Sequence, residues 1–194
     1  MKTYVENMPN FILEFNNTMN RKLKLWELNR VSEELFKEQP KFPVIVILND
    51  IRSLNNIGSF FRTSDAFNVE KIYLCGITAI PPHREIQKTA LGATETVNWE
   101  HRSSIIELVN ELKSQGVKVA SIEQAEKTTF LQHIHELDYE KIALVFGNEV
   151  DGVDQDVIDA SDYIIEIPQF GTKHSLNVSV CAGVILWEFA KRYV

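Results

Sequence analysis

Short apolar runs alternate with stretches of helical periodicity along most of the chain. Runs rich in β-branched residues predict strands at 44–48, 71–75, 117–122, 142–146 and 163–167. Helices are predicted at 57–67, 84–90, 103–115, 129–136, 155–160 and 175–192. Strands that alternate with helices in this way form a parallel sheet covered on both sides. We therefore predict an α/β fold with a mostly parallel sheet and helices on both faces.

Capping residues sharpen some of the predicted boundaries. Ser103 suits the N-cap of the helix at 103–115, and Gly116 suits its C-terminal end. Ser175 is a plausible N-cap for the last predicted helix, at 175–192. Ligands of such folds bind in loops at the carboxyl ends of the strands, so function is to be sought there.

The first part of the chain does not follow this alternation. Apolar positions at roughly helical spacing predict one or two short helices there. Ser32 suits an N-cap, and Pro40 makes continuation past Gln39 unfavourable. We divide the chain into a short N-terminal helical arm, residues 1–42, and a main domain, residues 43–194.

Composition narrows the cellular setting and the partners. The 194 residues are 44% hydrophobic, without an 18-residue apolar stretch or an export leader, so we expect neither membrane insertion nor secretion. Two cysteines are too few for a disulfide framework, which favours the cytoplasm. A net charge of −7 argues against a general nucleic-acid coat protein, although the arm is near neutral.

The segment 55–67, after the first strand, is the first unusual connection. Gly58 would let another group approach the backbone, and Arg62 is expected near a helix N-terminus, where free N–H groups favour anions. A plainer interpretation pairs Arg62 with Asp65 on the surface. Asn68 suits the left-handed conformation that ends a helix.

Two further segments follow apolar strands. In 146–153, Glu149 stands at a carboxyl strand end, and the glycines at 147 and 152 permit a backbone that wraps a small ligand, although Asp151-Gly152 also suits a plain turn. In 167–179, Asn177 and Ser179 need hydrogen-bond partners once they are buried.

Other enzyme classes lack their signatures. The patterns G-x-S-x-G, G-x-x-x-x-G-K and G-x-G-x-x-G do not occur, so hydrolase, nucleoside triphosphate and NAD interpretations lack support. His133 and His135 stand two positions apart on a predicted helix and point in different directions. We therefore expect no metal site.

Taken in order, the three segments resemble the motifs of the SpoU/TrmH family of S-adenosylmethionine (SAM)-dependent RNA ribose methyltransferases, part of the SPOUT class. The family patterns N-x-G-x-x-x-R-T, F-G-x-E-x-x-G and I-P-x-x-G-x-x-x-S-L-N-V match at Asn56, Gly58, Arg62 and Thr63, at Phe146, Gly147, Glu149 and Gly152, and at 167–178. Departures stand at Ser64, Asn68, Val150 and Gln169, where the family usually has Ala, Gly, Gly and Met.

The resemblance implies features that the residue pattern alone does not. It implies a C-terminal deep trefoil knot, whereas general rules predict no knot. It implies SAM bound through main-chain groups, which carries over to Gly147, Ile167 and Leu176. It also implies a homodimer, because the family active site combines residues of both subunits.

The resemblance implies transfer of a methyl group to a ribose 2′-hydroxyl, without a metal. The residues that it places in the catalytic site are Arg62, Asn56, Glu149, Ser175 and Asn177. A general-base role is proposed for the arginine of the family, but a guanidinium with a pKa above about 12 stays protonated. We therefore expect Arg62 to bind a phosphate and stabilise developing alkoxide charge, with Asn56 positioning it.

The substrate is tRNA or rRNA, and the short arm slightly favours tRNA. We expect RNA to bind a local basic patch, made of Arg52, Arg62, Arg84, Lys88 and Lys173. One alternative is a catalytically silent RNA-binding or assembly protein on the same fold. Another is a SAM-dependent enzyme that acts on a protein or a small molecule.

Overall fold

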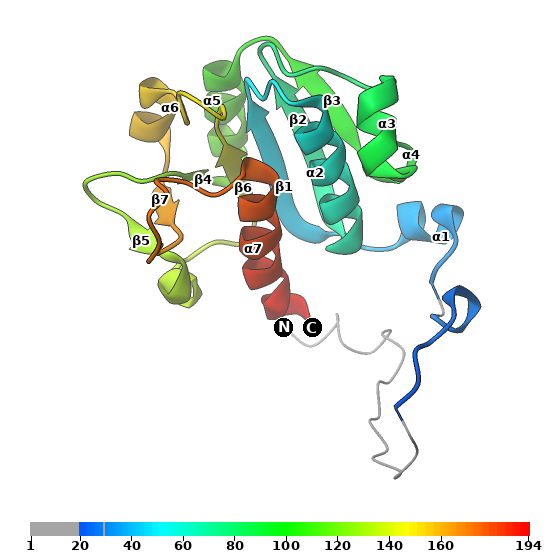
Figure 1. Cartoon of the computed structure of the whole chain (residues 1–194). Coiled ribbons are helices and arrows are strands. Elements are labelled where there is room, and N and C mark those ends of the chain that lie inside the picture. Colours follow the sequence, from blue (N-terminus) through cyan, green and yellow to red (C-terminus); the bar gives the residue numbers. More distant parts are fainter. Residues whose placement is uncertain (1–19, 29) are drawn as a thin grey trace.

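A single parallel sheet forms the centre of the molecule (Figure 1). The computed structural model describes residues 20–28 and 30–194, so the first 19 residues of the predicted arm lie outside it. Seven strands follow the order β3-β2-β1-β6-β4-β7-β5, and every neighbouring pair is parallel. The strands are β1 (Phe42–Asn49), β2 (Val69–Cys75), β3 (Trp99–Arg102), β4 (Lys118–Ile122), β5 (Thr129–Phe130), β6 (Ile142–Phe146) and β7 (Tyr163–Glu166).

Helices connect the strands and follow the last one. The α-helices are α1 (Glu33–Glu38), α2 (Leu54–Ala66), α3 (Arg84–Ala90), α4 (Ala93–Thr96), α5 (Ile105–Ser114), α6 (Gln155–Ala160) and α7 (Val178–Ala190). Short 3-10 helices are η1 (Leu25–Glu27), η2 (Leu131–Glu136) and η3 (Lys191–Tyr193). Within the described ranges, no helix combines the length and the apolarity that a membrane crossing needs.

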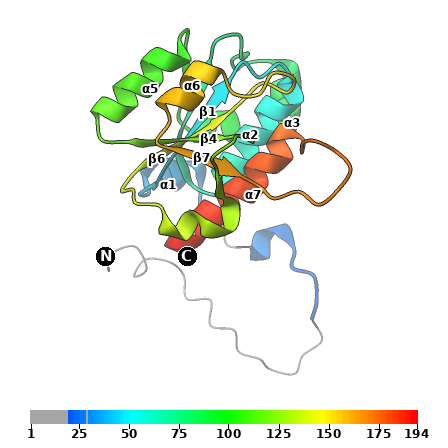
Figure 2. The same ribbon diagram turned by 90° about the vertical axis from the view of Figure 1, so that its left-hand side faces the viewer.

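Two helical layers cover the sheet (Figure 2). Alternate residues of β1 point to opposite faces, as the pleat of a strand requires. Val46 and Leu48 pack in the core under α2 and α7, whereas Ile45 and Ile47 pack in the core under α5 and α6. Both cores are formed largely by fully buried aliphatic side chains, which explains why the central strands read as continuous apolar runs. The predicted α/β class with helices on both faces is confirmed.

Three short elements were missed by the sequence analysis. The edge strand β3 has the sequence Trp-Glu-His-Arg and no buried residue, so it carries no hydrophobic pattern. Helix α4 is a single turn, which is too short for periodicity to appear. The helix predicted at 129–136 is instead the two-residue strand β5 followed by η2.

Several boundary residues also differ from the prediction. Helix α5 is capped by Ser104, whose Oγ accepts from the amide of Glu107, so the assignment to Ser103 was wrong by one position. Gly116 does follow this helix, with a left-handed φ of +81°. The last helix begins at Val178 with Asn177 as its cap, so the assignment of the cap to Ser175 was wrong.

Other capping predictions are confirmed. The Oγ of Ser32 accepts a hydrogen bond from the amide of Leu35, and α1 ends with Gln39 as its C-cap, before Pro40. Asn68 follows α2 with a φ of +50°.

Gly58 serves helix packing, which corrects the prediction that it opens the backbone to a ligand. It lies inside α2, and a Cβ at this position would stand 2.1 Å from Oγ1 of Thr89 and 2.3 Å from the carbonyl oxygen of Ile86. The hydroxyl of Thr89 also donates to the carbonyl of Asn55, at 3.0 Å. The missing side chain therefore lets α3 lie directly on α2.

Replacing Gly58 by alanine should lower the free energy of unfolding by about 1–3 kcal/mol, because the helices must separate. The matched control is Asn110→Ala in α5, an exposed position without a side-chain hydrogen bond among the described residues, where helix propensity should stabilise by up to about 0.7 kcal/mol. Urea unfolding of both variants checks this. Equal stabilisation by the two substitutions would contradict the packing role.

Candidate active site

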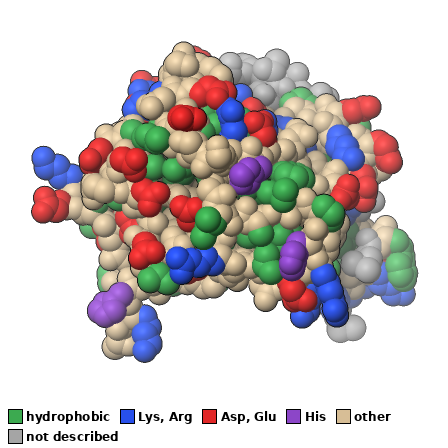
Figure 3. All heavy atoms as spheres, turned by 90° about the horizontal axis from the view of Figure 1, so that it is seen from above, with side chains coloured by type: hydrophobic (Ala, Val, Ile, Leu, Met, Phe, Trp, Pro, Cys, Tyr) green, Lys and Arg blue, Asp and Glu red, His purple; other side chains and the backbone are tan. Residues whose placement is uncertain are grey.

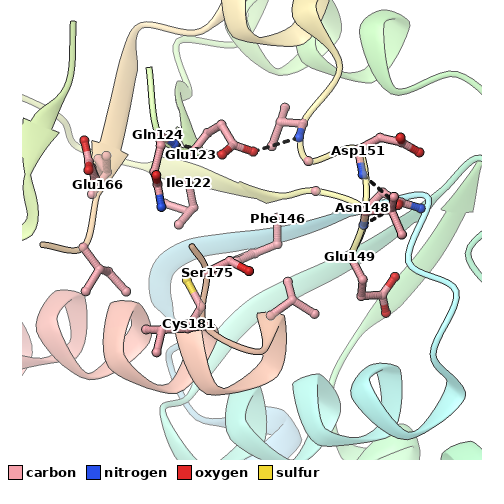
Figure 4. Close-up of a pocket in the computed structure, with 18 of the residues that line it drawn as sticks. Ile122, Glu123, Gln124, Phe146, Asn148, Glu149, Asp151, Glu166, Ser175 and Cys181 are labelled. Atoms are coloured by element: carbon pink, nitrogen blue, oxygen red, sulfur yellow. Dashed lines mark hydrogen bonds between the residues drawn. The ribbon is translucent and has the colours of Figure 1, made fainter. Parts of the chain in front are cut away.

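A pocket of about 630 Å³ lies at the carboxyl ends of β4, β6 and β7 and is closed by the start of α7 (Figure 4). Its apolar lining includes Ile122, Phe146, Ile165, Ile167, Leu176 and Val178. The pocket brings together six of the eight residues predicted for the cofactor and catalytic sites. These are Gly147, Glu149, Ile167, Ser175, Leu176 and Asn177.

The segment 146–153 folds tightly back on itself. The amide of Asn148 donates to the carbonyl of Gly152 at 2.9 Å, and the reverse bond measures 3.0 Å. A Cβ on Gly147 would stand 2.1 Å from the carbonyl carbon of Gly152, which itself has a φ of +74°. Both glycines are therefore needed for the turn that aims Glu149 away from the strand.

Glu149 reaches from this turn to the N-terminus of α2. Its carboxylate accepts from the amides of Arg52 and Ser53, both at 3.1 Å, and from Nδ2 of Asn56 at 3.0 Å. Burial raises the pKa of Glu149, but the hydrogen bonds from Arg52, its own amide, Asn56 and Ser53 outweigh it and hold that pKa below its ordinary value. Glu149 therefore acts as a charged anchor for α2.

Asn56 links this anchor to α7. Its Oδ1 accepts from Nδ2 of Asn177 at 3.2 Å and from Oγ of Ser179 at 3.5 Å. The Oδ1 of Asn177 in turn accepts from the amides of Ser179 and Val180, at 3.0 and 3.3 Å, and caps α7. Asn177 is exposed and Ser179 half-buried, so the expected burial of the two was wrong, but both have partners: Asn56 accepts from each, and the Ser179 hydroxyl also donates to Oδ1 of Asn177 at 2.7 Å.

The segment from Pro168 to Leu176 crosses the mouth of the pocket. Among the described residues its main-chain groups form no hydrogen bond with another main-chain group. A side chain holds it once, where Nε2 of Gln124 donates to the carbonyl of His174 at 2.9 Å. Its amides and carbonyls, including those of Leu176, are therefore available to a ligand in the pocket.

Arg62 does not join the other predicted catalytic residues within one chain. It lies in the third turn of α2, because the helix begins at Leu54, so the expected place near the helix N-terminus was wrong. Its side chain is exposed and forms no hydrogen bond or ion pair with any described residue. The pairing with Asp65 and the contact with Asn56, both considered from the sequence, are therefore not formed. As far as residues 20–28 and 30–194 are concerned, the guanidinium is thus free to bind another group.

Further pocket residues carry no motif and were missed by the sequence analysis. Glu123 accepts from the amides of Gln124 and Val153, at 2.8 and 3.1 Å, and ties β4 to the turn after β6. Its position directly after a predicted strand was the available signal. Cys181 stands one helical turn after Asn177, and burial raises the pKa of its thiol to about 12, so it is a neutral wall of the pocket.

The four other cations of the predicted basic patch, Arg52, Arg84, Lys88 and Lys173, are exposed. Two of them lie beside Glu85, with distances of 4.0 Å to Arg84 and 3.7 Å to Lys88. On the face seen from above, acidic and basic side chains are interspersed (Figure 3). RNA binding by this set stays a prediction.

Comparison with known proteins places these loops in a family. The model of the SpoU rRNA Methylase family matches residues 43–187. This range includes the three segments singled out in the sequence, 55–67, 146–153 and 167–179. A 23S rRNA (guanosine-2′-O-)-methyltransferase, RlmB, of Neisseria meningitidis serogroup B is 30% identical over 162 residues, which are 84% of this chain and 64% of the relative. The chain thus spans less than two thirds of that relative.

Solved structures share the fold. The TrmH/SpoU tRNA modifying enzyme of A. aeolicus superimposes with a TM-score of 0.71 at 27% identity, covering 82% of this chain and 79% of that one. An AdoMet-bound rRNA methyltransferase of Sinorhizobium meliloti superimposes with a TM-score of 0.73 at 23% identity, covering 85% and 62%. Together with the family model, which covers most of the sheet and its loops, these matches show that the chain belongs to the SpoU rRNA methylase family.

Proposed function

We propose that this protein transfers a methyl group from SAM to a ribose 2′-hydroxyl of tRNA or rRNA, and that it works as a homodimer. The observation that carries the proposal is the meeting of three separate motifs at one pocket, joined by the Glu149, Asn56 and Asn177 hydrogen bonds. The N. meningitidis relative is named as an RNA 2′-O-methyltransferase, and its printed activity is the one proposed here.

The pocket fits SAM in size and in chemistry. A volume of about 630 Å³ suits a ligand of that size, and the lining combines aliphatic side chains with unbonded main-chain groups. Gly147, Ile167 and Leu176 would hold the cofactor, which supplies a methyl group already activated on a sulfonium. The AdoMet-bound neighbour from S. meliloti shares the fold over 85% of this chain.

We assign Arg62 to the ribose hydroxyl that accepts the methyl group. A ribose hydroxyl gains negative charge on its oxygen as it attacks, and a guanidinium beside it stabilises that charge without giving up a proton. Arg62 has no partner in the described part of its own chain, so it is free to bind the RNA phosphate. Glu149, Asn56 and Asn177 position the pocket, and Ser175 offers a hydroxyl at its wall.

The homodimer is supported by an apolar stripe on α7. Val180, Val184 and Trp187 follow one side of the helix at helical spacing, and their exposed fractions are 55%, 40% and 51%. Exposure of a contiguous apolar stripe to water is unfavourable, and a second copy of the chain would cover it. In the dimer, Arg62 of one subunit would serve the pocket of the other.

The proposal includes a trefoil knot and a division of the chain into an arm and a main domain. The segment 168–176 crosses beside the end of β4, where Gln124 holds it, before entering α7. This passage is where we place the trefoil knot. The arm, residues 1–42, precedes the residues that the family model matches.

The direct test is methyl incorporation from labelled SAM into unmodified total cellular RNA, followed by digestion to nucleosides. We expect a 2′-O-methylated nucleoside with the native protein. With Arg62→Ala, we expect the turnover to fall by a factor of at least about 100. Labelling that survives ribonuclease would indicate a protein or small-molecule acceptor. SAM binding without any methylated RNA would indicate a silent RNA-binding protein.

Glu149→Gln should lower the free energy of unfolding by about 1 kcal/mol at neutral pH, because three N–H donors would face a group with one acceptor oxygen. The folded-state pKa of Glu149 is depressed, so its contribution is present above the unfolded pKa and is lost as pH falls through the folded value. The difference between native and variant should therefore begin to shrink near the unfolded pKa of a glutamate, about 4.3, and should continue to fall as the pH is lowered further.

The matched control is Glu126→Gln, since Glu126 is exposed and has no hydrogen bond or ion pair with the described residues. Urea unfolding across pH 3–8 provides the measurement. A loss for Glu149→Gln that stays constant down to pH 3 would show that the carboxylate charge is not what anchors α2.

Val184→Asp should weaken self-association by about 100-fold or more, because a carboxylate would be buried without a partner. Ile77→Asp is the control, since Ile77 is also exposed, at 65%, but lies after β2. Sedimentation equilibrium of both variants checks this. A Val184→Asp protein that remains dimeric would place the interface elsewhere.

A further inference from the structure

The pocket at the ends of β4, β6 and β7 carries charged side chains of one sign only. Four carboxylates line it, those of Glu123, Glu149, Asp151 and Glu166 (Figure 4). Within residues 20–28 and 30–194, no lysine, arginine or histidine lines it, and none of the four acids forms an ion pair. Arg52, Lys173 and His174 belong to neighbouring loops, but none of them lines the pocket. A ligand therefore meets negative charge without a compensating cation.

Glu123 is held in this lining by neutral main-chain groups. It directly follows β4 and is half-buried. Its Oε1 accepts from the amide of Gln124 at 2.8 Å, and its Oε2 accepts from the amide of Val153 at 3.1 Å. Gly152 leaves room for this carboxylate, because a Cβ there would stand 2.3 Å from Oε2. The two amides fix the carboxylate in place, and its oxygens keep further lone pairs for other interactions.

The other three acids are less suited to act on a ligand. The carboxylate of Glu149 is already bound by three N–H donors at the start of α2. Asp151 is exposed, so water and salt screen its charge. Glu166 accepts from the hydroxyl of Thr128 at 3.0 Å. Glu123 is therefore the half-buried acid of the lining that has no side-chain partner among the described residues.

The negative charge of Glu123 acts on another part of the lining. Burial raises the pKa of the Cys181 thiol to about 12, and the charge of Glu123 acts in the same direction. Cys181 lies in α7, whereas Glu123 follows β4, and both line the pocket. A ligand in the pocket is exposed to the same electrostatic field.

Methyl transfer changes the charge of the molecule that occupies the pocket. The C–S bond of SAM breaks with its electron pair left on sulfur, a C–O bond forms at the ribose oxygen, and the hydroxyl proton passes to water. The positive sulfonium thereby becomes the neutral thioether of S-adenosylhomocysteine (SAH). The ammonium, carboxylate and adenosine groups are common to both molecules. SAM and SAH therefore differ by one positive charge and one methyl group.

We infer that Glu123 is a specificity-determining residue, which makes the pocket bind SAM in preference to SAH. A carboxylate attracts a sulfonium without direct contact, and partial burial reduces the screening of this attraction by salt. The neutral product lacks the attraction, so it leaves the pocket more readily than the cofactor does. The inference rests on the proposed function and deepens it, because it assigns product discrimination to a residue outside the three family motifs.

The test neutralises Glu123 and compares ligands of different charge. Glu123→Gln removes the charge and keeps an acceptor oxygen. Glu126→Gln is the matched control, because Glu126 belongs to the same connection, is exposed and does not line the pocket. Isothermal titration calorimetry of the full chain gives the affinities for SAM, SAH and sinefungin, an analogue with an ammonium group in place of the methylsulfonium.

The native chain should bind SAM and sinefungin about tenfold more tightly than SAH. In Glu123→Gln, the affinities for SAM and sinefungin should fall about tenfold, and the affinity for SAH should change by less than about twofold. Glu126→Gln should bind all three ligands as the native chain does.

Equal weakening of all three ligands by Glu123→Gln would overturn the inference, because it would show that the carboxylate only holds the turn after β6. Unchanged affinities would overturn it as well. The native chain provides a test that needs no variant, since SAH binding as tight as SAM binding at low salt would contradict the charge preference. That result removes this inference alone, whereas a native chain that binds neither SAM nor SAH removes the proposed function too.

Discussion

The carboxylate of Glu149 holds together the parts of the candidate site. It accepts three N–H groups at the start of α2, one of which belongs to Asn56. Asn56 then accepts from Asn177, the cap of α7. Two helices and the turn after β6 are thereby fixed relative to one another by hydrogen bonds between residues more than 90 positions apart in sequence. The pocket lies on the inner side of this junction.

The place of Arg62 on α2 bears on the proposed homodimer. The anchoring hydrogen bonds of Glu149 and Asn177 meet at Asn56, in the first turn of α2, whereas Arg62 lies in the third turn of the same helix. Six residues separate Arg62 from Asn56, which is about 9 Å along the helix axis. A second subunit, docked on the apolar stripe of α7, offers a way to place Arg62 at a pocket. Within the described residues its guanidinium has no partner, which agrees with such a role.

The sequence predicted the central features well where burial or a motif left a pattern. The continuous apolar run of β6 and its following glycines located the pocket, because parallel strands place their ligands at the carboxyl ends. Polar edge elements such as β3 left no such signal. Contacts between distant segments, such as Asn56 with Asn177, could not be predicted from either segment alone. The role of Gly58 was misjudged because sequence does not show which neighbour approaches a glycine.

The composite nature of the site is the central claim, and subunit complementation tests it most directly. One variant lacks the guanidinium, Arg62→Ala, and the other has an obstructed pocket, Ser175→Trp, at an exposed lining residue. Each alone should methylate RNA very slowly. After dissociation and reassociation of an equal mixture, half of the dimers combine both variants and hold one intact site, so about a quarter of the native activity should return. A mixture as inactive as its components would show that Arg62 serves the pocket of its own chain.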